Sequence, residues 1–90
     1  MADIVYILTN ETMPGLVKIG FTTNDLAKRI KELYSTGVPL PFELFYACEV
    51  QDGASVERKL HDAFDDHRVS QNREFFRIAP ERVIPFLIHK

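Results

Sequence analysis

The chain has 90 residues, which is enough for a single domain over residues 1–90 because a second hydrophobic core cannot be built from this length. Hydrophobic residues make up 46% and charged residues 27%, a balance typical of a globular chain and not of a disordered one. The formal net charge of −2 excludes binding to nucleic acid by overall attraction, so any such contact requires a local basic patch.

The cellular location is predicted from the same composition. No apolar run approaches the roughly 18 residues that span a bilayer, and the first residues lack the basic flank of a secretory signal. The single cysteine, Cys48, has no partner for an internal disulfide, which agrees with a reducing compartment. We therefore expect a cytoplasmic protein.

Two segments near the start of the chain have the character of strands. Residues 4–8 and 16–21 are rich in β-branched and aromatic side chains. The segment between them contains the turn formers Asn10, Pro14 and Gly15, which predicts an antiparallel hairpin with a rather long loop. Tyr6 lies within the first strand and Lys18 within the second, and whether they share a face depends on a register that the pattern leaves open.

A first helix is predicted directly after this hairpin. Residues 22–24 are N-cap types, and residues 25–34 carry Leu26, Ile30 and Leu33 at helical spacing. Arg29 lies at the edge of this apolar stripe, from which it can reach toward the sheet.

The second half of the chain predicts one strand, one helix and two short segments. Residues 42–50 form a strand with too many apolar side chains for one solvated face, so it is expected to be central or covered on both sides. Residues 54–66 are predicted to be a helix, 74–78 a short strand or extended segment, and 80–88 a short helix that opens near Pro80.

Two charged side chains are candidates for a functional site. Glu57 lies at the margin of the second helix's apolar stripe, where a carboxylate is well placed to hold Mg²⁺, or it is a surface residue that pairs with His61 four positions later. Arg29 can clamp a phosphate with two parallel hydrogen bonds, or it can pair with a carboxylate of the protein itself. Spacing alone leaves both alternatives open.

Taken in order, these residues resemble the GIY-YIG nuclease superfamily. The triplet "IVY" at 4–6 occupies the position of the GIY triplet, and "KIG" at 18–20 occupies that of YIG, with eleven residues between Tyr6 and Lys18. The similarity is closest to the small phage-type branch, which has a KIG hairpin, an E-x-x-x-H helix (here "ERKLH") and a late "EFF" segment. The resemblance extends over about residues 4–78.

The resemblance implies an α+β fold with a three-stranded antiparallel β-sheet flanked by helices, and a metal-dependent DNA endonuclease or nicking activity. On this basis Glu57 would bind Mg²⁺ (or Mn²⁺), which polarises the phosphoryl oxygen. Tyr6 would act as the general base for the attacking water or orient it, and Arg29 would stabilise charge on the phosphate.

Two positions differ from the superfamily pattern, and two more belong to the phage-type branch. Ile4 replaces the first glycine, and Lys18 replaces the second tyrosine, where it would bind a phosphate oxygen as a point charge. His61 would support proton transfer or make a backbone contact. Glu74 would be structural or lie behind the metal ligand.

An alternative function is a catalytically inactive module that binds nucleic acid or protein on the same fold, and an accidental motif match is a third interpretation. A chain of this size has little surface for reading a DNA sequence, because specific interfaces bury about 1,000 Å² or more. We therefore expect specificity, if any, to come from a partner protein, a homodimer or DNA structure.

Overall fold

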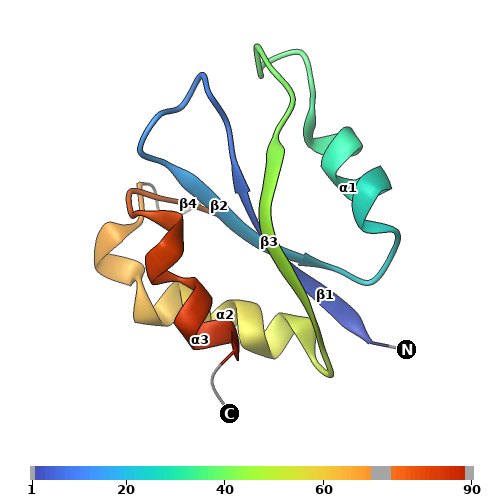
Figure 1. Ribbon diagram of the computed structural model, residues 1–90, viewed down its shortest axis with the longest axis vertical. Coiled ribbons are helices and arrows are strands. Elements are labelled where there is room, and N and C mark those ends of the chain that lie inside the picture. The colour runs from blue at the N-terminus through green and yellow to red at the C-terminus, as the bar shows by residue number, and fades with distance from the viewer. Residues whose placement is uncertain (1, 70–73, 89–90) are drawn as a thin grey trace.

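The structure, a computed structural model, describes residues 2–69 and 74–88 and consists of one antiparallel sheet with helices on both faces (Figure 1). The strands are β1 (Asp3–Thr9), β2 (Val17–Thr22), β3 (Glu43–Val50) and β4 (Phe75–Phe76), in the spatial order β3-β1-β2-β4. The helices are α1 (Leu26–Leu33), α2 (Gly53–Ala63) and α3 (Ile84–Ile88), with short 3₁₀ turns at Asp65–His67 and Pro80–Arg82.

The predicted fold class is confirmed, and the sheet has four strands instead of three. The added strand is β4, which comes from the "EFF" segment and pairs with β2 at Val17 and Lys18. A strand of two residues is too short to be distinguished from an extended segment by its sequence pattern. It is recognised as a strand only by its hydrogen-bonded pairing.

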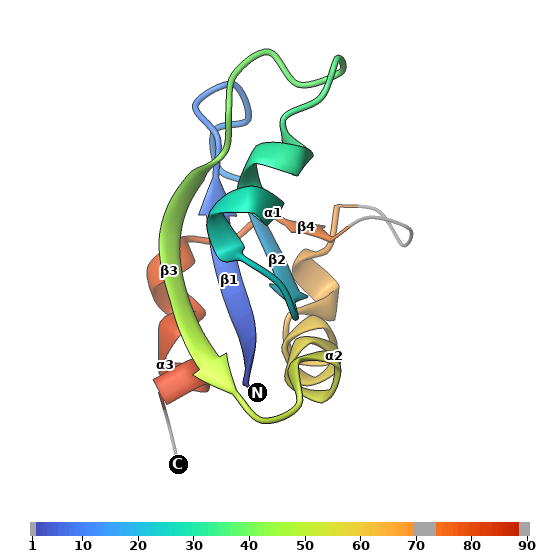
Figure 2. The same cartoon turned by 90° about the vertical axis from the view of Figure 1, so that its right-hand side faces the viewer.

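Strand β1 forms the centre of the molecule. Its residues Val5, Tyr6, Ile7 and Leu8 are all buried, and alternate side chains enter two separate cores. Val5 and Ile7 face α2 and α3, whereas Tyr6 and Leu8 face α1. Figure 2 shows α1 on one side of the sheet and α3 on the other. Both faces of β1 are therefore closed to water.

Residues 42–50 are expected from their sequence to form a strand that is central or covered on both sides, and the first alternative is wrong, because β3 lies at an edge of the sheet. Its apolar content has another reason: Tyr46 packs against one core and Ala47 against the other. Toward its start, Leu44 and Phe45 are exposed, beside a register shift in the pairing with β1. The two faces of β3 are thus only partly covered, and β1 is the central strand instead.

The helix starts differ slightly from the predicted ones. Asp25, and not one of residues 22–24, caps α1 by accepting hydrogen bonds from two backbone amides of the first turn. Asp52 caps α2, which ends at Ala63 and not at residue 66. Within the described residues, no helix is long and apolar enough to cross a membrane.

The start of α2 is fastened to the start of β1. The backbone amide of Gly53 donates a hydrogen bond of 2.7 Å to Asp3 Oδ2. A Cβ at Gly53 would lie 2.6 Å from Phe21 Cδ2 and 2.9 Å from Asp3 Cβ, so only glycine allows this approach. This contact sets the position of α2 on the sheet and therefore the position of Glu57, one turn further along.

Candidate active site

The pairing of β1 with β2 answers which way Tyr6 and Lys18 point. Tyr6 pairs with Gly20, and Leu8 pairs with Lys18. Paired residues of antiparallel strands project to the same face, and so do residues two apart on one strand. Tyr6 and Lys18 therefore lie on the same face of the hairpin, the face that α1 partly covers.

Gly20 allows the ring of Tyr6 to lie close against β2. A Cβ at Gly20 would come within 2.7 Å of the Tyr6 hydroxyl oxygen and 2.8 Å of Cζ, distances that real Cβ atoms do not show. The last residue of the "KIG" triplet thus shapes the place that the tyrosine of the "IVY" triplet occupies. The two triplets form one packing unit.

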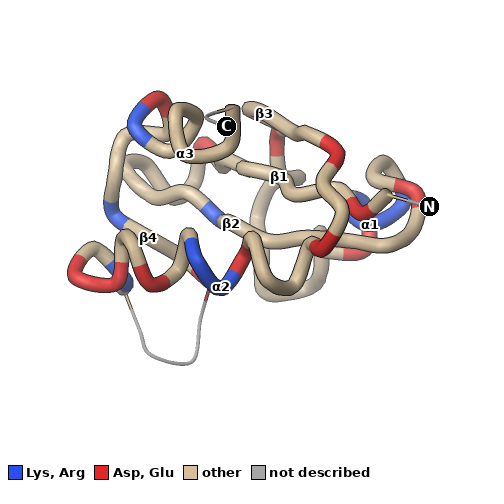
Figure 3. The backbone as a smooth tube through the Cα atoms, turned by 90° about the horizontal axis from the view of Figure 1, so that it is seen from below, with Lys and Arg blue, Asp and Glu red and all other residues tan. Residues whose placement is uncertain are grey.

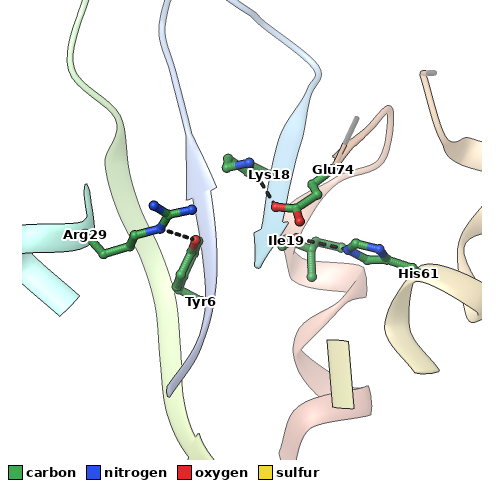
Figure 4. A network of polar contacts seen from close by, with 6 residues as sticks. All are labelled: Tyr6, Lys18, Ile19, Arg29, His61 and Glu74. Carbon is green, nitrogen blue, oxygen red and sulfur yellow. Dashed lines mark hydrogen bonds and ion pairs between the residues drawn. The ribbon is translucent and has the colours of Figure 1, made fainter. Parts of the chain in front are cut away.

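Arg29 reaches this tyrosine from α1. Its Nε donates a long hydrogen bond of 3.5 Å to the Tyr6 hydroxyl (Figure 4). Its Nη1 lies 3.7 Å from Glu32 Oε1. Burial raises the pKa of Tyr6, while the hydrogen bond and positive charge of Arg29 act in the opposite direction. The hydroxyl is therefore a neutral phenol held beside a guanidinium.

Lys18 is held by a carboxylate from the far end of the chain. Lys18 Nζ lies 3.0 Å from Glu74 Oε1 and 5.2 Å from the centre of the Phe75 ring, and its side chain is only 11% exposed. The main chain supports the same arrangement, because the amide of Ile19 donates to the Glu74 carbonyl at 3.1 Å. Glu74 thus acts as the direct partner of Lys18.

Glu57 brings a second carboxylate to this cation. Burial, and after it the negative charge of Glu74, raise the pKa of Glu57 from 4.5 to about 7, against the opposing positive charge of Lys18. The charges of Glu57 and Glu74 also act on Tyr6. Four side chains from β1, β2, α1 and α2 therefore share one electrostatic environment, together with Glu74 before β4.

His61, one turn after Glu57, is placed differently. Its Nε2 lies 3.0 Å from the carbonyl oxygen of Ile19, and its ring centre lies 5.0 Å from that of Phe76. A carbonyl oxygen only accepts, so Nε2 must carry the hydrogen. Of the two roles expected for His61, this geometry is that of the backbone contact. It ties α2 to β2, as Figure 4 shows.

The residues brought together here are of the types that could bind a metal ion and a phosphate. Among the described residues, there is no group of three or more His, Cys, Asp or Glu side chains that could hold a metal ion by itself. Mg²⁺, however, is usually held by one or two carboxylates with waters and substrate phosphates. Glu57 with the adjacent Glu74 is a donor set of this kind, and its excess negative charge suits a cation.

Sequence reasoning overlooked two features of this cluster. The ion pair between Lys18 and Glu74 joins residues 56 positions apart, and no local pattern signals such a contact. The close approach of Tyr6 to Gly20 had a signal, namely a glycine inside a strand, which often marks the approach of another group.

Comparison with known proteins places the chain in a family. The T5orf172 domain family matches residues 3–88, nearly the whole chain. No curated protein and no solved structure matches it. Because the match includes every strand and helix described above, the chain belongs to the T5orf172 domain family.

Proposed function

We propose that this protein is a metal-dependent DNA endonuclease or nicking domain of the GIY-YIG type, which hydrolyses a phosphodiester bond by one-metal chemistry. The observation that carries the proposal is the common face of Tyr6 and Lys18, with Arg29 hydrogen-bonded to the tyrosine and Glu57 beside the lysine. A phenol, two cations and a carboxylate at one place can orient a water molecule, stabilise charge on a phosphate and hold a divalent ion, which together support phosphodiester hydrolysis.

Glu57 is the proposed metal ligand, with Glu74 as its neighbour. A half-buried carboxyl with a pKa raised to about 7 lacks sufficient positive charge around it, and Mg²⁺ or Mn²⁺ would supply that charge. When bound, the ion would polarise a phosphoryl oxygen and stabilise the leaving group.

The other side chains have roles in binding and orientation. Arg29 stabilises negative charge on the phosphate with the guanidinium nitrogens that Tyr6 leaves available. Tyr6 orients the attacking water through its hydroxyl, a role that its raised pKa favours over that of a general base. Lys18 binds a phosphate oxygen as a point charge once substrate competes with Glu74 for it.

One observation favours the alternative, a catalytically inactive module that binds nucleic acid or protein. Lys18 replaces a tyrosine of the superfamily pattern and is already engaged in an ion pair of 3.0 Å within the protein. A site that has exchanged a phenol for a paired lysine can keep its shape and lose a catalytic step.

The experiment is nicking of supercoiled plasmid, with single-stranded and branched DNA alongside, in Mg²⁺, in Mn²⁺ and in EDTA. The wild type is compared with Glu57→Gln and Arg29→Ala, and with the matched controls Glu49→Gln and Arg82→Ala, which change exposed residues outside the site. Circular dichroism verifies that each variant is folded.

We expect metal-dependent cleavage that both site variants lose by at least about a hundredfold and that both controls keep. A folded wild type that binds DNA and cleaves none of these substrates in either metal would support the inactive module. Cleavage that persists in Glu57→Gln would contradict the metal assignment.

A further inference from the structure

A groove of about 330 Å³ opens beside Arg29. Its wall on one side is the end of β2 and the connection 23–25, and on the other side it is α1 with Lys28, Arg29 and Glu32. We propose that this groove binds the nucleoside and phosphodiester group that flank the scissile phosphate on the same DNA strand. The inference rests on the proposed function, since it assigns a second subsite to that substrate.

The groove is continuous with the candidate active site. Arg29 belongs to both, because its Nε contacts the Tyr6 hydroxyl while its side chain lines the groove. Thr22 also lines the groove, and it lies two residues after Gly20 on β2, on the face that carries Tyr6. A strand whose phosphate lies at Arg29 would therefore continue along the end of β2.

The carboxylates of the groove are already occupied. Asp25 Oδ1 accepts hydrogen bonds from the amides of Ala27 at 2.9 Å and Lys28 at 3.3 Å, which also occupies the amino end of α1. Glu32 Oε1 lies 3.7 Å from Arg29 Nη1. Neither carboxylate is therefore a free anion that would repel a phosphate at full strength.

The remaining side chains suit a nucleotide. Within residues 2–69 and 74–88, the side chains of Thr23, Asn24 and Lys28 make no hydrogen bond or ion pair. Lys28 offers a cation for a phosphate, and Thr23 and Asn24 offer donors and acceptors for a sugar or base. Figure 3 shows both basic and acidic residues in the regions of α1 and α2, so the positive charge of Lys28 is a local one.

The groove is large enough to hold part of a nucleotide. Its volume of about 330 Å³ falls at the lower end of the range for small-molecule sites, roughly 300–1,000 Å³.

The test is binding of a fluorescein-labelled single-stranded oligothymidylate in EDTA, followed by fluorescence anisotropy over a series of salt concentrations. Lys28→Ala is compared with Lys31→Ala, which removes the same exposed charge from the same helix outside the groove. We expect Lys28→Ala to weaken binding about twofold to fivefold at low salt and to reduce the salt slope by about one. Lys31→Ala should match the wild type.

A second readout identifies the ligand. In ¹⁵N NMR spectra, the oligothymidylate should shift the amides of residues 22–25, whereas the same concentration of inorganic phosphate should not. Equal shifts with phosphate would overturn the nucleotide subsite and leave a general anion site.

The two proposals fail in different ways. Identical binding by Lys28→Ala and Lys31→Ala, with metal-dependent plasmid nicking intact in both, would overturn the subsite alone. A wild type that neither binds the oligothymidylate nor nicks plasmid would overturn the subsite and the nuclease function together.

Discussion

Tyr6 lies across Gly20 so closely that a Cβ at the glycine would stand 2.7 Å from the tyrosine hydroxyl oxygen. Tyr6 is only 1% exposed, so its ring is enclosed by neighbouring atoms. This contact explains why a strand in the sheet contains glycine at the position paired with the tyrosine. Any larger residue must displace the Tyr6 ring or β2 from its present position.

Gly20→Ala is therefore expected to destabilise the fold and to disturb the site at once. Overpacking of this kind costs about 1–3 kcal/mol in the free energy of unfolding, and displacement of the Tyr6 hydroxyl should lower cleavage at least about tenfold. Urea denaturation and plasmid nicking measure the two effects. Gly37→Ala is the matched control, since a Cβ there meets no atom within 4 Å. Equal behaviour of the two variants would show that the ring adapts freely.

Glu57→Gln should stabilise the protein in EDTA above neutral pH. The folded-state pKa of about 7 lies above the ordinary 4.5, so the folded protein binds the proton more strongly than the unfolded chain between these values. The contribution of Glu57 to stability is therefore fully present below pH 4.5 and is lost as the pH rises toward 7. Above pH 7 the neutral glutamine should gain about 1–2 kcal/mol, a figure reduced for the partial exposure of the side chain.

This prediction is checked by urea denaturation of wild type and variant from pH 4.5 to pH 8, with Glu49→Gln as a control for loss of one exposed carboxylate. The difference between Glu57→Gln and wild type should grow through this range and then level off. A constant difference would mean that Glu57 titrates as an ordinary exposed glutamate.

Lys18→Met tests the ion pair with Glu74. The substitution leaves two neighbouring carboxylates without their cation, so the free energy of unfolding at pH 8 should fall by about 1–3 kcal/mol. The double variant Lys18→Met with Glu74→Gln should recover part of this loss, and neither variant should cleave DNA. Lys59→Met, an exposed lysine of α2, serves as the control. If the changes in the free energy of unfolding of the single variants Lys18→Met and Glu74→Gln add up to that of the double variant, the two side chains do not interact directly.

His61→Ala should act through the position of α2. Loss of the hydrogen bond to the Ile19 carbonyl should cost about 1–2 kcal/mol and lower cleavage by loosening the turn that carries Glu57. His61→Gln, whose amide can still donate to that carbonyl, should keep most of both properties. If glutamine preserves stability but cleavage is lost as fully as in the alanine variant, His61 transfers a proton instead.

Much of the fold was predictable because its signals are local. Alternating β-branched residues predicted β1 and β2, and the spacing of Leu26, Ile30 and Leu33 predicted α1 to within a residue or two. The α+β class followed from this order of elements. The candidate residues Tyr6, Arg29 and Glu57 came from the ordered motifs, which are also local.

Other features needed contacts between distant segments. The apolar content of β3 suggested a central strand, yet the same composition fits an edge strand that packs against two cores in part. β4 exists through its pairing with β2 and a bridge between Phe76 and Arg68, and its two residues have no periodicity of their own.

The sequence by itself determined the elements, their order and the residue types available for chemistry, because periodicity and capping act over a few positions. The tertiary structure alone decided that Tyr6 and Lys18 share a face, that Glu74 pairs with Lys18 across 56 positions, and that His61 binds a backbone carbonyl. These outcomes depend on strand register and on the docking of α2. Register changes the face of every side chain with a shift of one residue, and only the packing of both cores together selects it.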